Sequence, residues 1–153
     1  MATRYTVTLS KVMKELSLNP ISMPDDPDRI LISSTDVNRP GLELNGFFDY
    51  YDKDRIIILG NAETAFLNSI SPERRLRVLD QIFSKRPPAV IIARGLKPVP
   101  ELLQSTKEND VPLLSTSETT SSLVARLVSF MNWPRASHAT AYWSKSTAKE
   151  SFW

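Results

Sequence analysis

From residue 54 onward, short continuous apolar runs alternate with longer segments whose apolar residues recur every three or four positions. The apolar runs are DRIIILG (54–60), PPAVIIARGL (87–96) and VPLLSTSE (111–118). Such runs are typical of strands buried on both faces of a parallel sheet. The segments with helical spacing are NAETAFLNSI (61–70), SPERRLRVLDQIFSK (71–85), PVPELLQSTKEND (98–110) and TTSSLVARLVSFM (119–131). This alternation predicts an α/β fold with a small mixed, mostly parallel sheet flanked by helices.

Residues that favour helix starts support these boundaries. Ser71 followed by Pro72 indicates the start of the helix in 71–85, and Thr119 or Thr120 is expected to cap the helix in 119–131. Near the N-terminus, TLSKVMKELSL (8–18) also has helical spacing, with Thr8 or Ser10 as its expected cap.

The region between this first helix and residue 54 is less regular. The stretch NPISMPDDPD (19–28) is rich in proline and aspartate and is interpreted as a connector. RILISSTD (29–36) predicts a short strand. RPGLELNGFFDYY (39–51) alternates loosely and carries Gly41 and Gly46.

Charge and composition exclude several classes of function. The formal net charge of +2 lies entirely in residues 132–153, so residues 1–131 are neutral overall. They have no excess of positive charge of the kind that nucleic-acid-binding domains use to contact phosphates. The chain has no cysteine, which excludes disulfides, a thiolate nucleophile and a Cys-based zinc site and suits the cytoplasm. The amphipathic start is unlike a signal peptide, and no apolar run approaches the roughly 18 residues of a membrane helix.

The sequence contains no phosphate-binding loop motif, and its motifs predict no catalytic or metal site. Gly41 and Gly46 have the separation of a phosphate-binding loop, but Phe47 and Phe48 stand where that motif requires Lys and Ser or Thr. His138, the only histidine, has no plausible partner for acid–base work. Asp49, Asp52 and Asp54 fit a solvated turn better than a metal site.

Two polar stretches are candidates for ligand binding. The first comprises Ser34, Thr35, Asp36, Asn38, Arg39 and Gly41, and the second is Arg94 with Gly95 at the carboxyl end of a predicted strand. If the strands in 29–36 and 87–96 are parallel neighbours, both turns lie at one sheet edge and favour a phosphate or carboxylate. The alternative is structural: Asp36 pairs with Arg39, and Arg94 faces water.

Three stretches resemble the N-terminal domain of HPr kinase/phosphorylase. The family pattern D-x-N-R-P-G-L-x-L-x-G-[FY]-F-D-Y-[FY] is matched almost residue for residue by Asp36 to Tyr51. The pattern RIxxLGxxE is matched by Arg55 to Glu63, and xRGLxxPxEL by Arg94 to Leu102. The resemblance covers residues 6–131, nearly the whole body of the chain.

The resemblance implies a bacterial cytoplasmic, hexameric enzyme that phosphorylates a serine of HPr, a carrier of the sugar phosphotransferase system, and removes that phosphate by phosphorolysis. In that family a second domain carries the P-loop, ATP and Mg²⁺, whereas the first resembles the first domain of Mur ligases and has no settled catalytic role. This chain stops before the P-loop, so no catalytic residues are carried over and no cofactor is expected. The implied partners are the kinase domain and, through it, HPr, with self-association left open and neither nucleic acid nor membrane expected. A stand-alone module for a nucleotide or sugar phosphate is the alternative.

Residues 132–153 break the pattern of the domain predicted for residues 1–131. This tail holds all three tryptophans and has neither strand nor helix periodicity. A disordered extension or a vector-derived run is one explanation. However, permitted codons for the tail, read from the third base of the Asn132 codon, spell LAPRITRHGVLVEVYGEGVLL. That peptide resembles the family stretch LAPRxTxHGVLVEVYGxGVLI, which leads into the P-loop. We therefore interpret the tail as an out-of-frame reading of the kinase-domain start.

The DNA sequence across codons 128–153 tests this interpretation. We expect the reading frame that begins at the third base of codon 132 to encode that peptide, because the last two bases of each shifted codon are largely dictated by the observed residue. A shifted frame without this peptide would favour a plain extension.

Overall fold

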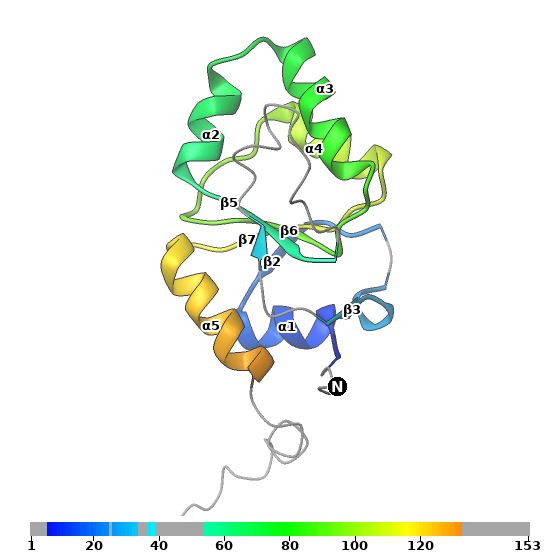
Figure 1. Cartoon of the computed structure of the whole chain (residues 1–153), viewed down its shortest axis with the longest axis vertical. Coiled ribbons are helices and arrows are strands. Elements are labelled where there is room, and N and C mark those ends of the chain that lie inside the picture. Colours follow the sequence, from blue (N-terminus) through cyan, green and yellow to red (C-terminus); the bar gives the residue numbers. More distant parts are fainter. Residues whose placement is uncertain (1–5, 25, 34–36, 39–53, 133–153) are drawn as a thin grey trace, which may run out of the picture.

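The computed structural model describes residues 6–24, 26–33, 37–38 and 54–132, and the main sheet within them has five strands (Figure 1). The strand order is β2-β7-β6-β5-β4. Strands β4, β5, β6 and β7 run parallel, and β2 is antiparallel at the edge. Their bounds are β2 Asn19–Ser22, β4 Val37–Asn38, β5 Ile56–Leu59, β6 Val90–Ile92 and β7 Leu113–Ser115. The predicted mixed, mostly parallel sheet is confirmed.

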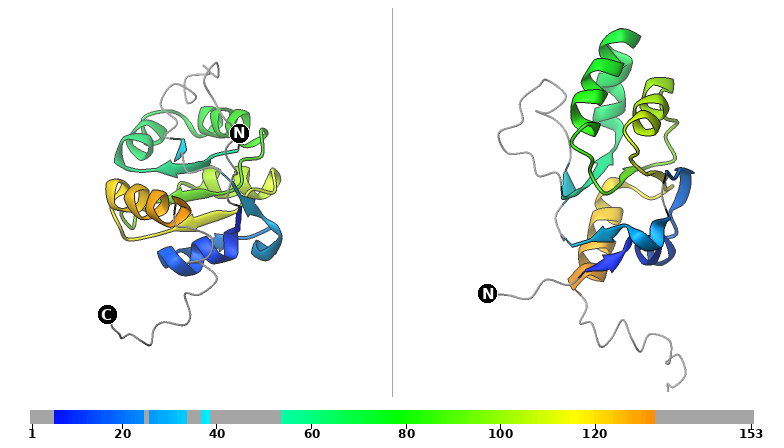
Figure 2. Two further views of the ribbon diagram at one scale, coloured as in Figure 1. Left: turned by 60° about the horizontal axis from the view of Figure 1, so that its bottom comes forward. Right: turned by 90° about the vertical axis from the view of Figure 1, so that its right-hand side faces the viewer.

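Helices cover both faces of this sheet, which gives three layers (Figure 2). Helices α1 (Leu9–Leu16) and α5 (Thr120–Asn132) lie on one face. Helices α2 (Asn61–Asn68), α3 (Pro72–Phe83) and α4 (Pro100–Glu108) lie on the other. A separate two-stranded ribbon pairs β1 (Val7–Thr8) antiparallel with β3 (Leu31–Ile32), and a short 3₁₀ turn, η1, spans Pro27–Arg29.

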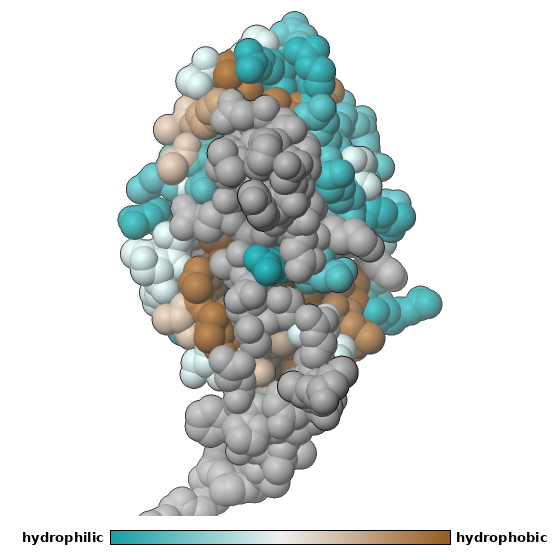
Figure 3. Space-filling view, viewed as in Figure 1, coloured by the Kyte–Doolittle hydropathy of each residue, from teal (hydrophilic) through white to brown (hydrophobic). Residues whose placement is uncertain are grey.

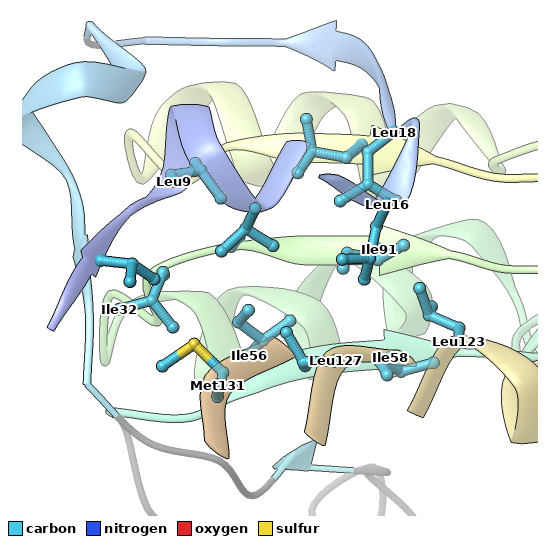
Figure 4. Packing of buried hydrophobic residues seen from close by; sticks show 14 residues of the cluster. Leu9, Leu16, Leu18, Ile32, Ile56, Ile58, Ile91, Leu123, Leu127 and Met131 are labelled. Atoms are coloured by element: carbon cyan, nitrogen blue, oxygen red, sulfur yellow. The ribbon is translucent and has the colours of Figure 1, made fainter. Parts of the chain in front are cut away.

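The apolar strands divide their side chains between two cores, because successive residues of a strand point to opposite faces. Ile56, Ile58 and Ile91 enter the first core, against α1 and α5 (Figure 4). Ile57 and Ile92 enter the second, against α2, α3 and α4. Every residue of β5 and β6 is buried, as the continuous apolar runs predicted.

The observed helix starts confirm the predicted caps. Thr8 accepts a hydrogen bond from the Lys11 backbone N–H at the start of α1. Ser71 does the same for Arg74 N–H at the start of α3. Thr119 accepts from Ser122 N–H at the start of α5, which selects Thr119 over Thr120. Each cap satisfies a backbone donor that the first helical turn leaves unpaired.

One prediction for the N-terminal region is wrong, and a second is correct only in part. Residues 19–28 are not only a connector, because Asn19–Ser22 form the edge strand β2. Pro20 is compatible with that position, since an edge strand leaves one row of backbone groups unpaired. The strand expected in 29–36 is only Leu31–Ile32, and it pairs with β1 outside the main sheet.

No helix among the described residues has the length and apolar character needed to span a bilayer. The tail at 133–153 lies outside the described residues.

Ile91 tests the importance of the first core. Its side chain is fully buried in the central strand β6, so we expect Ile91→Ala to lower the free energy of unfolding by about 2–5 kcal/mol. Leu31→Ala is the control, because Leu31 is 60% exposed and its truncation should cost about 0.5 kcal/mol or less. Equal losses in urea unfolding of the two variants would contradict this assignment of the core.

Candidate functional site

The two candidate stretches are only partly within the described residues. Asn38 ends β4, and Arg94 and Gly95 follow β6. Ser34, Thr35, Asp36, Arg39 and Gly41 lie outside the described residues. Their predicted role therefore stays a prediction.

The assumed neighbour relation between the two stretches needs correction. The strand expected in 29–36 is not a parallel neighbour of β6, because β3 belongs to the separate ribbon. Instead, β4 and β6 flank β5 on either side, and all three strands are parallel. Asn38 lies level with Ile57 and hence with Val90, at the beginning of β6 rather than at its carboxyl end.

Arg94 and Gly95 lie where the topology of the sheet changes. Helix α4 follows β6 on one face of the sheet, whereas α5 follows the adjacent strand β7 on the other face. Loops that diverge in this way from the carboxyl ends of neighbouring parallel strands commonly border the ligand crevice of an α/β sheet. The sequence predicted that Arg94 and Gly95 follow the carboxyl end of a strand, and in this fold that place is where a ligand crevice is expected.

Backbone hydrogen bonds tie the two loops together at this point. The N–H groups of Arg94 and Gly95 donate to the carbonyl oxygens of Glu118 (2.8 Å) and Thr116 (2.9 Å), and Thr116 N–H donates to Ile92 O at 2.9 Å. Arg94 and Gly95 both have left-handed backbones, with φ of 63° and 65°. The left-handed conformation is unfavourable for residues that have a Cβ, so glycine suits position 95. The preference comes from the backbone conformation and not from a lack of space, because a Cβ at Gly95 would meet no atom within 4 Å.

These bonds limit what the turn can offer a ligand. Since both backbone N–H groups already have acceptors, they are not an anion-binding nest. Unlike the two backbone N–H groups, the guanidinium of Arg94 is not engaged by another charged group. The residue is exposed, and its side chain makes no ion pair among the described residues. Any recognition of an anion by this turn therefore depends on the Arg94 side chain.

The starts of α2 and α5, at the same sheet edge, are occupied by the protein's own side chains. At α2, Glu63 is 5% exposed and its Oε1 accepts from Gly60 N–H at 2.8 Å. At α5, the Glu118 carboxylate accepts from the Ser122 hydroxyl at 2.7 Å and pairs with Arg126. A carboxylate beside the positive end of a helix dipole takes the place that a phosphate would otherwise fill. Glu63 and Glu118 are side chains that the sequence analysis missed, although Glu63 stands at the third position of its helix, where a capping box is expected.

The space between β5, β6 and α4 is almost filled. A hollow of about 10 Å³, lined in part by Leu59, Ile92 and Leu102, is no larger than one water molecule requires. Among the described residues, no group of three or more His, Asp or Glu side chains is placed to hold a metal ion. The described part of this edge is thus a packed surface, and the loop after β6 carries two exposed cations, Arg94 and Lys97.

Comparison with known proteins assigns this fold to a family. A family model described as HPr Serine kinase N terminus matches residues 7–131. Proteins named HPr kinase/phosphorylase are similar to this chain: that of Lachnoclostridium phytofermentans is 34% identical over 83% of the chain, and that of Caldicellulosiruptor bescii is 33% identical over 90%. The chain spans only 41% and 44% of the length of these two relatives.

A solved structure shares the fold at much lower identity. It is the regulatory region of Clostridium perfringens pyrophosphatase, its CBS and DRTGG domains complexed with the activator diadenosine tetraphosphate. The likeness has a TM-score of 0.57 and 15% identity, and it covers 80% of this chain and 46% of that one. This comparison is evidence about the fold alone.

Arg94 provides the test of ligand binding at this edge. We expect inorganic phosphate to raise the melting temperature of the chain, and Arg94→Ala to abolish that rise, because a ligand bound only by the native state stabilises it. The variant itself should stay folded, since the side chain is exposed. Arg77→Ala, which removes an exposed arginine of α3, is the matched control and should retain the rise. A rise of the same size in the Arg94 variant, or none in the parent chain, would leave the structural interpretation of the turn.

Proposed function

Because this chain belongs to the family described as HPr Serine kinase N terminus, we propose that it serves as the non-catalytic N-terminal domain of a bifunctional HPr kinase/phosphorylase. The observation that supports this proposal is the family match over residues 7–131, which runs from β1 to the last turn of α5. The matched segment therefore includes both cores and all five strands of the main sheet.

In this proposal, phosphoryl transfer belongs to the part of the relatives that the chain does not span. Transfer from ATP needs a phosphate cradle, a metal ion and a positioned acceptor. The starts of α2 and α5, at the carboxyl edge of the described sheet, carry Glu63 and Glu118, which repel rather than stabilise a triphosphate. The chain's role is then to support a kinase domain that binds ATP and Mg²⁺ and acts on HPr, in the cytoplasm, to regulate sugar uptake and carbon metabolism.

A second candidate is a module that binds a nucleotide or sugar phosphate without catalysing a reaction. It is favoured by the exposed guanidinium of Arg94 at the diverging β6 and β7 loops. The pyrophosphatase region that shares this fold was solved with a dinucleotide activator, which is a property of that protein. The first candidate is preferred, because it accounts for the whole matched segment rather than for one turn.

The purified 153-residue chain should neither phosphorylate HPr with ATP nor hydrolyse ATP. The reason is that Gly41 and Gly46 lack the lysine that a P-loop requires after its second glycine. Transfer of labelled phosphate to HPr is the measurement, with the full-length Lachnoclostridium phytofermentans relative as the positive control. HPr phosphorylation above the level of a heat-inactivated sample would disprove the non-catalytic role.

A further inference from the structure

The β1–β3 ribbon carries the most exposed large apolar side chain among the described residues. Leu31 is 60% exposed, and the other large apolar side chain of this kind, Ile21 on β2, is 38% exposed. The neighbour of Leu31, Ile32, is 1% exposed and belongs to the first core. Since alternate residues of a strand face opposite ways, the ribbon is buried on the side of Ile32 and open on the side of Leu31.

Helix α5 ends against the inner side of the same ribbon. Met131, in the last turn of α5, is 2% exposed and shares the first core with Val7 and Ile32. Figure 4 shows Met131 and Ile32 directed toward one another. Because the end of α5 is anchored by this contact, the polypeptide that follows it begins beside the ribbon.

Charge is distributed differently on the opposite side of the molecule. Arg74, Arg77, Lys85 and Arg86, on or just after α3, are all exposed. Figure 3 shows hydrophilic atoms over the α3 side, whereas hydrophobic atoms gather over α5 and near β3. Exposed charged side chains are depleted at the centres of protein interfaces, so the α3 side suits contact with water.

We propose that the open side of the β1–β3 ribbon, centred on Leu31, is the surface against which the polypeptide that follows α5 packs in full-length members of this family. The inference rests on the proposed function. In the relatives the matched segment is the N-terminal part, and 41–44% coverage leaves more than half of each protein beyond it. That remainder follows α5, whose last turn packs against the inner side of the same ribbon through Met131.

The ribbon has a physical reason to need such a partner. It has only two residue pairs, Val7 with Ile32 and Thr8 with Leu31, and two-stranded ribbons are marginally stable in water unless a further element packs on them. The first core covers its inner side. An apolar surface placed over Leu31 would cover its outer side and hold the ribbon between two layers.

Amide hydrogen exchange in a full-length chimera tests the proposal. The chimera joins residues 1–131 of this chain to the part of the Caldicellulosiruptor bescii relative that follows its matched segment. We expect exchange at residues 30–33 to be slower in the chimera than in the 153-residue chain by about tenfold, because a covered ribbon opens less often. Exchange in α3 should be the same in both proteins.

Two matched variants identify the contact. Leu31→Asp in the chimera should remove the added protection, and Ile21→Asp, the same change at the other exposed apolar position, should keep it. Both variants should fold, because both side chains are exposed. Equal exchange at 30–33 in the chimera and the 153-residue chain would overturn the proposal, and so would protection that survives Leu31→Asp. Protection that appears in the 153-residue chain as its concentration rises would instead assign the surface to a second copy.

The same chimera separates this inference from the proposed function. Phosphorylation of HPr by the chimera reports whether residues 1–131 can replace a family N-terminal domain. Protection of the ribbon without HPr phosphorylation would count against the proposed function, and HPr phosphorylation without protection would count against the surface.

Discussion

The burial of β5, β6 and β7 on both faces is the constraint on which the rest of this structure depends. These three strands present isoleucine, leucine and valine side chains to both sides of the sheet. A strand of this kind is stable only when helices cover both of its faces. The connections β5 to β6 and β6 to β7 place α2, α3 and α4 on one face, and the chain covers the other with α5 and with α1 from its N-terminal region.

This requirement explains the polar contacts at the surface of the helical layer. Arg75 donates from Nε to Leu67 O at 2.5 Å and pairs with Glu101 at 3.3 Å, so that it joins α2, α3 and α4. Asp80 accepts from Ser105 at 2.5 Å and from Asn109 at 3.2 Å, which ties α3 to α4 a second time. On the other face, Arg126 pairs with Glu118 and donates to Glu15 O at 2.8 Å, which links α5 to α1. These charged residues orient helices whose apolar faces already pack.

The burial of the sheet on both faces also limits which groups of the candidate site can bind a ligand. Since α4 and α5 lie on opposite faces, the loops after β6 and β7 must diverge, and the backbone bonds of Arg94 and Gly95 close the gap between them. Those bonds, with Glu63 and Glu118 at the neighbouring helix starts, leave few groups for an anion.

The sequence alone determined the elements whose signals are local. Continuous apolar runs identified β5, β6 and β7, and Ser71 and Thr119 marked helix starts, because burial on both faces and capping impose residue types on neighbouring positions. The position of Arg94 and Gly95 after a buried strand was predicted for the same reason.

The tertiary structure decided the features that depend on residues distant in the sequence. Asn19–Ser22 is a strand because β7 offers it an edge, and Leu31–Ile32 leaves the main sheet because β1 pairs with it. The backbone acceptors of Arg94 and Gly95 come from a loop more than twenty residues later in the chain, and hydrogen bonds over such separations leave no periodic trace in the sequence.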